Sequence, residues 1–277
     1  MTESFEYLQP THVKFGPGRL EEVVETVQGH GSRCLLVTEE KGGPLEDVYQ
    51  RVEQMFESSS VDLERFSGAR PNPTVDAVSE GAKVAEDHGS EVVLAIGGGS
   101  TMDTGKAVAL EATHGGTAWD YLFFRDKDPT PAILPVVAVP TTSGTGSHVT
   151  KVAVLTNRAE DKKSAIVHPN MFPECCIVDP ELTASMPPSV TASTGFDVFT
   201  HAFESYINVG HQPYVDVLAE KSLQLIVKNL PQAIEDGSDL EARSGMCFAD
   251  TLGGMCIANV GTTLPHAMGQ PISGHCP

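Results

Sequence analysis

The sequence has no long hydrophobic run, and none of its apolar stretches is long enough to span a bilayer. The first residues, Met1 to Glu6, are acidic and lack the basic-then-apolar order of a secretory signal peptide. The six cysteines show no CxxC spacing and are too sparse for a disulfide scaffold. These absences predict a cytoplasmic protein with reduced thiols and no membrane partner.

Basic residues are scarce as well. The chain has 18 Lys and Arg against 37 Asp and Glu, which gives a formal net charge of -19. A surface this acidic repels nucleic acid and anionic lipid, so we expect neither as a partner. Hydrophobic residues make up 40% of the 277 residues, enough to bury a core, and this length favours two domains.

The first two-thirds of the chain alternates apolar runs with amphipathic segments. The pattern predicts strands at 34–38, 61–66, 92–96 and 133–139, and helices at 20–28, 45–57, 75–88 and 101–113. Thr74 and Ser100 are expected to cap helix starts. Such alternation is typical of a parallel sheet that helices cover on both faces.

The pattern changes after Asp179-Pro180, where the strand-like runs stop. Pro187-Pro188 predicts a break, and helical patterns follow at 194–208, 214–230 and 240–258. We therefore expect an α/β domain over residues 1–181 and a helical domain over residues 182–277.

Two polar loops follow predicted strands. Gly97-Gly98-Gly99-Ser100 opens a helix, where free backbone N–H groups suit a diphosphate, although a plain tight turn explains the glycines equally well. The Gly105-Lys106 pair nearby resembles part of a Walker A loop but departs from it at Ser100 and Ala107. The second loop, 140–147, is rich in Thr, Ser and Gly. Both loops follow the carboxyl ends of strands, where open α/β sheets bind ligands.

A candidate metal site comes from the helical part. Asp197 and His201 are four residues apart and share one helix face, and Glu204 and Asn208 extend that polar stripe. The simpler interpretation is a solvated polar stripe on an amphipathic helix. If Asp197 and His201 instead hold a metal, we expect Glu204→Ala, on the same face, to keep it. With His266 added, a carboxylate and two imidazoles suit Fe²⁺ or Zn²⁺, which can polarise an alcohol oxygen.

An ordered series of short segments resembles the iron-containing alcohol dehydrogenase family. The matching stretches are 15–18, 71–74, 97–100 with Asp103, 140–145, 179–183, 194–197 with 201–204, and 265–268. Each match is modest, but the ordered set is specific and covers essentially the whole chain. The resemblance implies a dehydroquinate synthase-like fold: an α/β N-terminal dinucleotide-binding domain plus an all-α C-terminal metal domain, incomplete at the C-terminus.

The resemblance also implies the site and the activity. The activity is hydride transfer between NAD(H) and a small alcohol or aldehyde, with Fe²⁺ expected and Zn²⁺ as the alternative. Three of four metal ligands would be Asp197, His201 and His266. The residues implied around the cofactor are Gly98, Gly99, Ser100 and Asp103 at the diphosphate, Thr141, Thr142 and Thr145 in the same cleft, Lys163 and Leu182 nearby, and Asn72 and Glu39 at the adenosine end.

The chain departs from the family pattern in three places. His148 stands where the family often has an acid, and Gln270 stands where a second His often faces the nicotinamide. Gln cannot exchange a proton near neutral pH, so any proton relay must use other groups. The family's fourth ligand is a His farther along, whereas this sequence ends at Pro277 with only His275 nearby.

Other functions remain open at this stage. One is a glycerol-dehydrogenase-like oxidation of polyols, and another is a catalytically inactive fragment that binds only a dinucleotide. A dehydroquinate-synthase-like activity would need a basic pocket for an anionic substrate, and Lys and Arg are scarce here. The sequence also leaves open whether the protein is a homo-oligomer.

We predict a preference for NAD over NADP, because Glu39 at a strand end would repel a 2′-phosphate and accept hydrogen bonds from a ribose 2′-OH. The test compares kcat/KM for the two cofactors in an active, full-length form. Equal or better use of NADP would remove this role for Glu39, and Glu39→Gly would then have no effect on selectivity.

We also predict that residues 1–277 alone are a poor enzyme. Three protein ligands leave a metal under-coordinated, and apolar helix faces left uncovered favour aggregation. Metal content, cofactor binding and alcohol oxidation should be compared between this chain and a version extended by its natural continuation. Full activity of the short form would contradict the prediction, and loss of metal in His275→Ala would then identify a substitute ligand.

Overall fold

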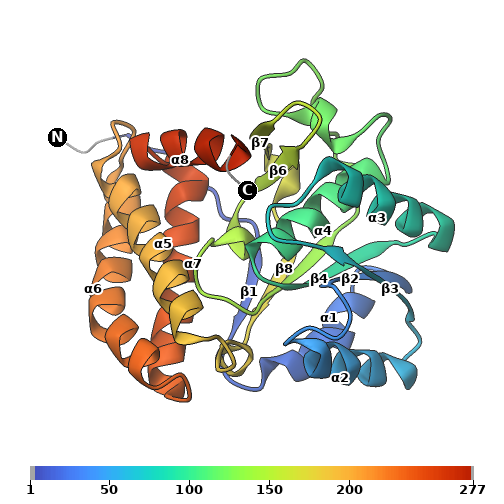
Figure 1. Ribbon diagram of the computed structural model, residues 1–277, viewed down its shortest axis with the longest axis horizontal. Helices are drawn as coiled ribbons and strands as arrows, with labels where there is room; N and C mark the ends of the chain where they lie inside the picture. The colour runs from blue at the N-terminus through green and yellow to red at the C-terminus, as the bar shows by residue number, and fades with distance from the viewer. Residues whose placement is uncertain (1–3, 276–277) are drawn as a thin grey trace.

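The computed structural model describes residues 4–275. Its centre is a parallel sheet of six strands in the order β1-β8-β5-β4-β2-β3 (Figure 1). These strands are β1 His12–Phe15, β2 Arg33–Glu39, β3 Asp62–Ala69, β4 Val92–Gly97, β5 Val136–Pro140 and β8 Cys175–Val178. A separate antiparallel ribbon consists of β6 Val152–Asn157 and β7 Lys162–Val167.

Helices cover both faces of the sheet, as the sequence pattern predicts. The helices of this part are α1 Val23–Gln28, α2 Glu46–Glu57, α3 Val75–His88 and α4 Gly99–Glu111. Along β2, Cys34 and Leu36 face the apolar cluster that includes α1 and α2, whereas Leu35 and Val37 face the cluster that includes α3 and α4. Burial on both faces explains why the strand sequences are apolar throughout rather than alternating.

The two predicted helix caps have different outcomes. Thr74 caps α3, since its hydroxyl accepts the backbone N–H of Ala77 at 3.3 Å. The prediction for Ser100 is wrong: α4 begins at Gly99, after Gly98 in an extended conformation, and Ser100 lies inside the helix. Because the glycines allow the turn from β4 into α4, the helix begins before Ser100, the first residue here with a side-chain hydroxyl.

The sequence analysis missed β1, β6, β7 and β8. β8 has only four residues, and it becomes a strand by pairing with β1 on one side and β5 on the other. β1 is an edge strand that contains His12 and Lys14, and the β6–β7 ribbon lies outside the main sheet. Their strand character depends on long-range pairing, which a local apolar pattern does not record.

The helical part follows β8 and consists of α5 Pro188–Ile207, α6 Pro213–Glu235, α7 Leu240–Val260 and α8 Leu264–His275 (Figure 1). The three helices predicted there are confirmed and are longer than expected. α5 starts at Pro188, well before the predicted start at Thr194, because proline is favoured in the first turn of a helix. The pair Pro187-Pro188 therefore begins a helix where the sequence predicted only a break.

Within residues 4–275, no helix combines the length and apolar character needed to cross a membrane. The described cysteines, at positions 34, 175, 176, 247 and 256, are buried free thiols. Cys276 lies outside the described residues.

One loop packs the α/β part against the helical part. Gly146, in the loop after β5, has a left-handed φ of 61°. A Cβ built on Gly146 would collide with the backbone of Gly254 on α7. Glycine at both positions lets the loop backbone touch the helix, and this contact brings the carboxyl edge of the sheet next to the helices.

Candidate functional site

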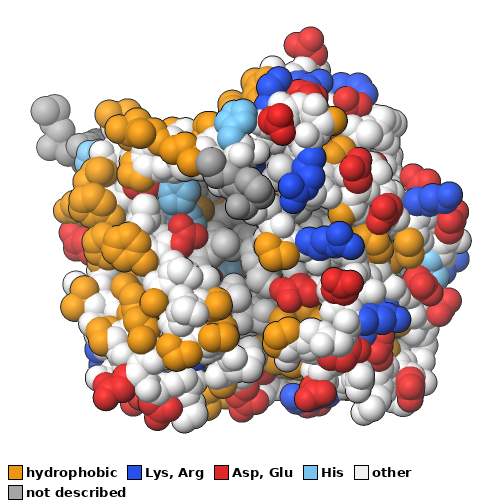
Figure 2. Space-filling model, in the orientation of Figure 1, with side chains coloured by type: hydrophobic (Ala, Val, Ile, Leu, Met, Phe, Trp, Pro, Cys, Tyr) orange, Lys and Arg blue, Asp and Glu red, His pale blue; other side chains and the backbone are white. Residues whose placement is uncertain are grey.

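A cavity of about 840 Å³ opens between the carboxyl edge of the sheet and the helical part. Figure 2 shows this face of the molecule hollowed between the two parts. The sequence-predicted site residues that line it are Asn72, Gly99, Ser100, Asp103, Thr145, Lys163, Asp197, His201 and His266. Residues far apart in the chain, and expected to serve a cofactor and a metal, therefore share one cleft.

The two polar loops lie side by side because β4 and β5 are neighbours in the sheet. The backbone N–H of Thr141 donates to the carbonyl of Gly97 at 3.0 Å. A Cβ on Gly99 would collide with the side chain of Thr145, so this close approach requires glycine. The N-terminus of α4 thus opens into the cleft with the threonine loop packed against it.

Asp103 lines the cleft, but its carboxylate is occupied by groups of the protein. It accepts the Ser147 hydroxyl at 2.6 Å and the backbone N–H of Val154 at 2.9 Å. The Lys106 ammonium lies 3.3 Å from the same carboxylate and donates to the carbonyl of Ser147 at 3.1 Å. Lys106 is buried and bound to groups of the protein, so it does not face the cleft as the lysine of a Walker A loop faces a phosphate.

Lys163 and Asn72 meet at the wall of the cleft. The Lys163 ammonium donates to Asn72 Oδ1 at 2.8 Å and to the Ser273 hydroxyl at 2.9 Å. Burial lowers the pKa of Lys163. The contact with Ser273 also joins β7 to α8, so Lys163 links the two sides of the cleft.

Other predicted cofactor residues lie beside the cleft or behind it. Gly98 and Thr142 are adjacent, since a Cβ on Gly98 would lie 3.5 Å from Thr142. Thr141 is buried, and Leu182 packs in the apolar cluster that includes α1 and α2. Glu39 ends β2 and is half-buried, and burial raises its pKa. None of these five is among the residues that line the cavity.

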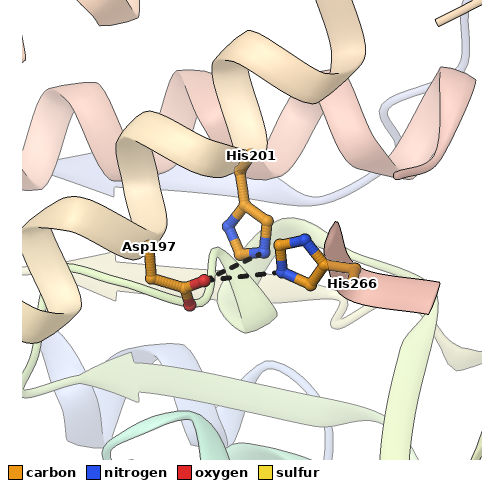
Figure 3. Close-up of side chains that lie close together, drawn as sticks. All are labelled: Asp197, His201 and His266. Carbon is orange, nitrogen blue, oxygen red and sulfur yellow. Dashed lines mark ion pairs between the residues drawn. The ribbon is translucent and has the colours of Figure 1, made fainter. Parts of the chain in front are cut away.

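The three predicted metal ligands lie together, with Asp197 and His201 on α5 and His266 on α8 (Figure 3). Asp197 Oδ1 is 3.8 Å from His201 Nε2 and 3.4 Å from His266 Nε2. The two imidazole rings stack with centroids 4.7 Å apart. One ligand atom from each of the three residues falls within 4.8 Å of the others.

The other nitrogen of each imidazole has a protein partner. His201 Nδ1 is 3.1 Å from the carbonyl oxygen of Gly144, and His266 Nδ1 is 2.7 Å from Glu204 Oε1. The hydrogen bond with Asp197, and then that with Glu204, raises the pKa of His266 to about 9 against the effect of burial. With both Nδ1 atoms occupied, the Nε2 atoms and the carboxylate converge on one point, an arrangement that fits a divalent cation.

Comparisons with protein families identify the family of this chain. The family model for iron-containing alcohol dehydrogenase matches residues 10–180, and the model for the C-terminal domain of the same family matches residues 191–277. The chain belongs to the iron-containing alcohol dehydrogenase family. The predicted fold, an α/β part with a parallel sheet followed by a helical part, is confirmed.

Individual relatives are similar over almost the whole chain. Alcohol dehydrogenase 4 of Schizosaccharomyces pombe is 36% identical over 265 residues, which cover 96% of this chain and 62% of that protein. The archaeal halo-thermophilic Red Sea brine pool alcohol dehydrogenase ADH/D1 has a TM-score of 0.96 at 37% identity, covering 100% of this chain and 71% of that one. Sulfoacetaldehyde reductase from Bifidobacterium kashiwanohense, solved with NAD⁺, has a TM-score of 0.89 at 36% identity and covers 98% and 71%. The chain thus spans between 62% and 71% of the length of these three relatives.

Two acids in the site have contacts that sequence reasoning missed. Glu204 does not lie on a solvated stripe: it is 1% exposed and hydrogen-bonded to His266, so the expectation that Glu204→Ala spares the metal loses its basis. Because Glu204 lies about one turn after His201 on the same helix, its sequence position could have indicated that it belongs to the site. Asp250 on α7 accepts the backbone N–H of Gly146 at 2.9 Å. No local pattern marks Asp250, because its partner is distant in sequence.

The three residues that depart from the family pattern have different surroundings. His148 is fully buried against α7, with Nε2 3.0 Å from the Thr251 hydroxyl, and burial lowers its pKa to about 3. It is therefore neutral, and it is not among the residues that line the cavity. Gln270 lines the cavity, whereas His275 is exposed at the end of α8.

Asp250 should make stability depend on pH. Burial raises the pKa of Asp250 to about 7, against the opposing backbone N–H groups of Gly144 and Gly146. Between about pH 4 and pH 7 the folded chain keeps a proton that the unfolded chain releases, so this residue's contribution falls as pH rises. Asn at this position does not titrate and still offers an oxygen to Gly146.

The measurement is the free energy of unfolding in urea for wild type and Asp250→Asn across that pH range. We expect wild type to lose stability relative to the variant by on the order of a few kcal/mol as pH rises. The comparison cancels the titration of groups common to both proteins. A difference that stays constant with pH would contradict the assignment.

Proposed function

We propose that the protein is an oxidoreductase that transfers a hydride between NAD(H) and an alcohol or aldehyde. The observation that carries this proposal is a single cleft with Gly99 and Thr145 on one side and the cluster of Asp197, His201 and His266 on the other. A nicotinamide cofactor supplies the hydride chemistry, and the protein orients it against the substrate. The similarity to alcohol dehydrogenase 4 of Schizosaccharomyces pombe supports this activity.

In this proposal, Asp197, His201 and His266 are the metal ligands, with Fe²⁺ as the expected ion and Zn²⁺ as the alternative. One carboxylate oxygen and two imidazole nitrogens suit a borderline divalent cation. When bound, such an ion polarises the oxygen of the substrate. Asp197 contributes the negative charge, and the hydrogen bonds at Nδ1 leave the Nε2 atoms of both histidines free to coordinate.

The proposed place for the NAD diphosphate is the N-terminus of α4. Gly98, Gly99 and Ser100 provide backbone N–H groups there, and the helix dipole favours negative charge. The remaining residues proposed around the cofactor are Asp103, Thr141, Thr142, Thr145, Lys163 and Leu182, with Asn72 and Glu39 at the adenosine end. The relative from Bifidobacterium kashiwanohense was solved with NAD⁺, which supports this choice of cofactor.

The proposed division assigns residues 1–181 to dinucleotide binding and residues 182–277 to metal binding. The two family models, which match residues 10–180 and 191–277, support a boundary in this region. The proposed substrate is a small alcohol or aldehyde. The aliphatic side chains of Val152, Val154 and Ile257 line the cleft, which favours such a substrate over the alternative, a polyol.

Three measurements distinguish alcohol oxidation from polyol oxidation and from dinucleotide binding alone. Bound metal and turnover of NADH distinguish an enzyme from an inactive fragment that only binds a dinucleotide. A panel of simple alcohols, aldehydes and glycerol then distinguishes alcohol oxidation from polyol oxidation. Dinucleotide binding without metal or turnover in the version extended by its natural continuation would contradict the proposed activity.

Asp197→Ala and His201→Ala should each lower the bound metal while the fold persists, because each removes one of three converging ligand atoms. Metal content after dialysis against Zn²⁺ or Fe²⁺ is the measurement, and circular dichroism checks the fold. Ser193→Ala, an exposed position on the same helix, is the control and should keep its metal. Stoichiometric metal in both ligand variants would contradict the assignment of Asp197 and His201 as metal ligands.

A further inference from the structure

The C-terminal half of α5 is hydrogen-bonded to the connection between α7 and α8. Ser205 donates to the carbonyl of Gly261 at 3.4 Å, and Asn208 donates to the carbonyl of Thr262 at 3.4 Å. Glu204 accepts both the backbone N–H and the hydroxyl of Thr263, the latter at 3.1 Å. Three successive residues of the connection are therefore held by Glu204 and Ser205 of α5 and by Asn208, which directly follows that helix.

Glu204 differs from the other two in reaching beyond the connection. Its Oε2 accepts from Thr263, while its Oε1 lies 2.7 Å from His266 Nδ1. The side chain is only 1% exposed, so water does not compete effectively for these contacts. A buried carboxylate keeps its charge when it is hydrogen-bonded in this way, and a charge-assisted bond to an imidazole is among the stronger ones.

We propose that Glu204 is a positioning residue for the metal site. It accepts a hydrogen bond from the N–H at His266 Nδ1 and so leaves Nε2 as the nitrogen that faces Asp197 and His201. Through Thr263 it also fixes where α8 begins and hence where the His266 ring lies. The inference rests on the proposed function, since it takes the three residues to be metal ligands. A carboxylate that orients a ligating imidazole also raises its basicity toward the metal.

A purely structural role makes a different prediction. If Glu204 only fastens the connection, its loss should resemble the loss of Ser205, which fastens the same connection from the same helix and is fully buried. Among the described residues, the hydrogen bond of the Ser205 hydroxyl goes to Gly261 and not to His266. Ser205→Ala is therefore the matched control for Glu204→Ala, and Glu204→Gln keeps one oxygen that can still accept from His266 Nδ1.

The experiment titrates the purified chain and its variants with Zn²⁺ and with Co²⁺. The dissociation constant for Zn²⁺ and the visible absorption spectrum of bound Co²⁺ are measured, and circular dichroism and thermal unfolding verify the fold. We expect Glu204→Ala to weaken Zn²⁺ binding by about 10- to 100-fold and to change the Co²⁺ spectrum. Glu204→Gln should recover part of the affinity, and Ser205→Ala should match wild type in both readouts.

The outcomes separate the two proposals. If wild type binds Zn²⁺, Asp197→Ala abolishes that binding and Glu204→Ala behaves like Ser205→Ala, the positioning role is wrong and the metal site stands. If wild type binds no Zn²⁺ or Co²⁺, or Asp197→Ala changes nothing, the metal site itself is wrong and the role of Glu204 falls with it. Should Glu204→Ala fail to fold, a folded Glu204→Gln variant with a Zn²⁺ affinity below that of wild type and an altered Co²⁺ spectrum supports the role. A folded Glu204→Gln variant identical to wild type in both readouts overturns it.

Discussion

The site depends on the hydrogen bond between the loop after β5 and α5: His201 Nδ1 lies 3.1 Å from the carbonyl oxygen of Gly144. Gly144 belongs to the loop after β5, whereas His201 stands on α5. The same loop carries Thr145 to the glycine turn before α4 and Gly146 to Asp250 on α7. The loop therefore sets the distance between the proposed cofactor and metal sites, and a shift in the loop would move both.

The loop can make these contacts because of its glycines. A Cβ on Gly144 would lie 2.8 Å from the Cβ of Thr194 on α5, and one on Gly146 would strike Gly254 on α7. Side chains at these positions would push the helices away from the sheet. Hydride transfer requires the reacting atoms to be close and well aligned. Mutations that shift the surrounding backbone even slightly therefore slow the reaction. The glycines thus serve the spacing of the site as well as the turn.

The features that could be predicted from the sequence are those that depend on contacts between residues close together in the chain. The cap at Thr74 and the shared face of Asp197 and His201 follow from local helix geometry, and the structure has both arrangements. The place of His266 could come only from family resemblance, because it depends on the connection before α8. β8 could not be foreseen from its four residues, since it is a strand by virtue of β1 and β5. Long-range contacts of this kind leave no periodic signal in the chain.

The three ligand positions are not supported equally. Each imidazole has its Nδ1 fixed, His201 by a backbone carbonyl and His266 by a buried carboxylate. Asp197 has a side chain that is 37% exposed, and in the described part of the chain no backbone N–H donates to it. The nitrogen ligands are therefore pre-organised, whereas the oxygen ligand can adjust toward the open cleft. In the proposed arrangement the cofactor and the substrate bind in this cleft, so the adjustable ligand is the one exposed toward them.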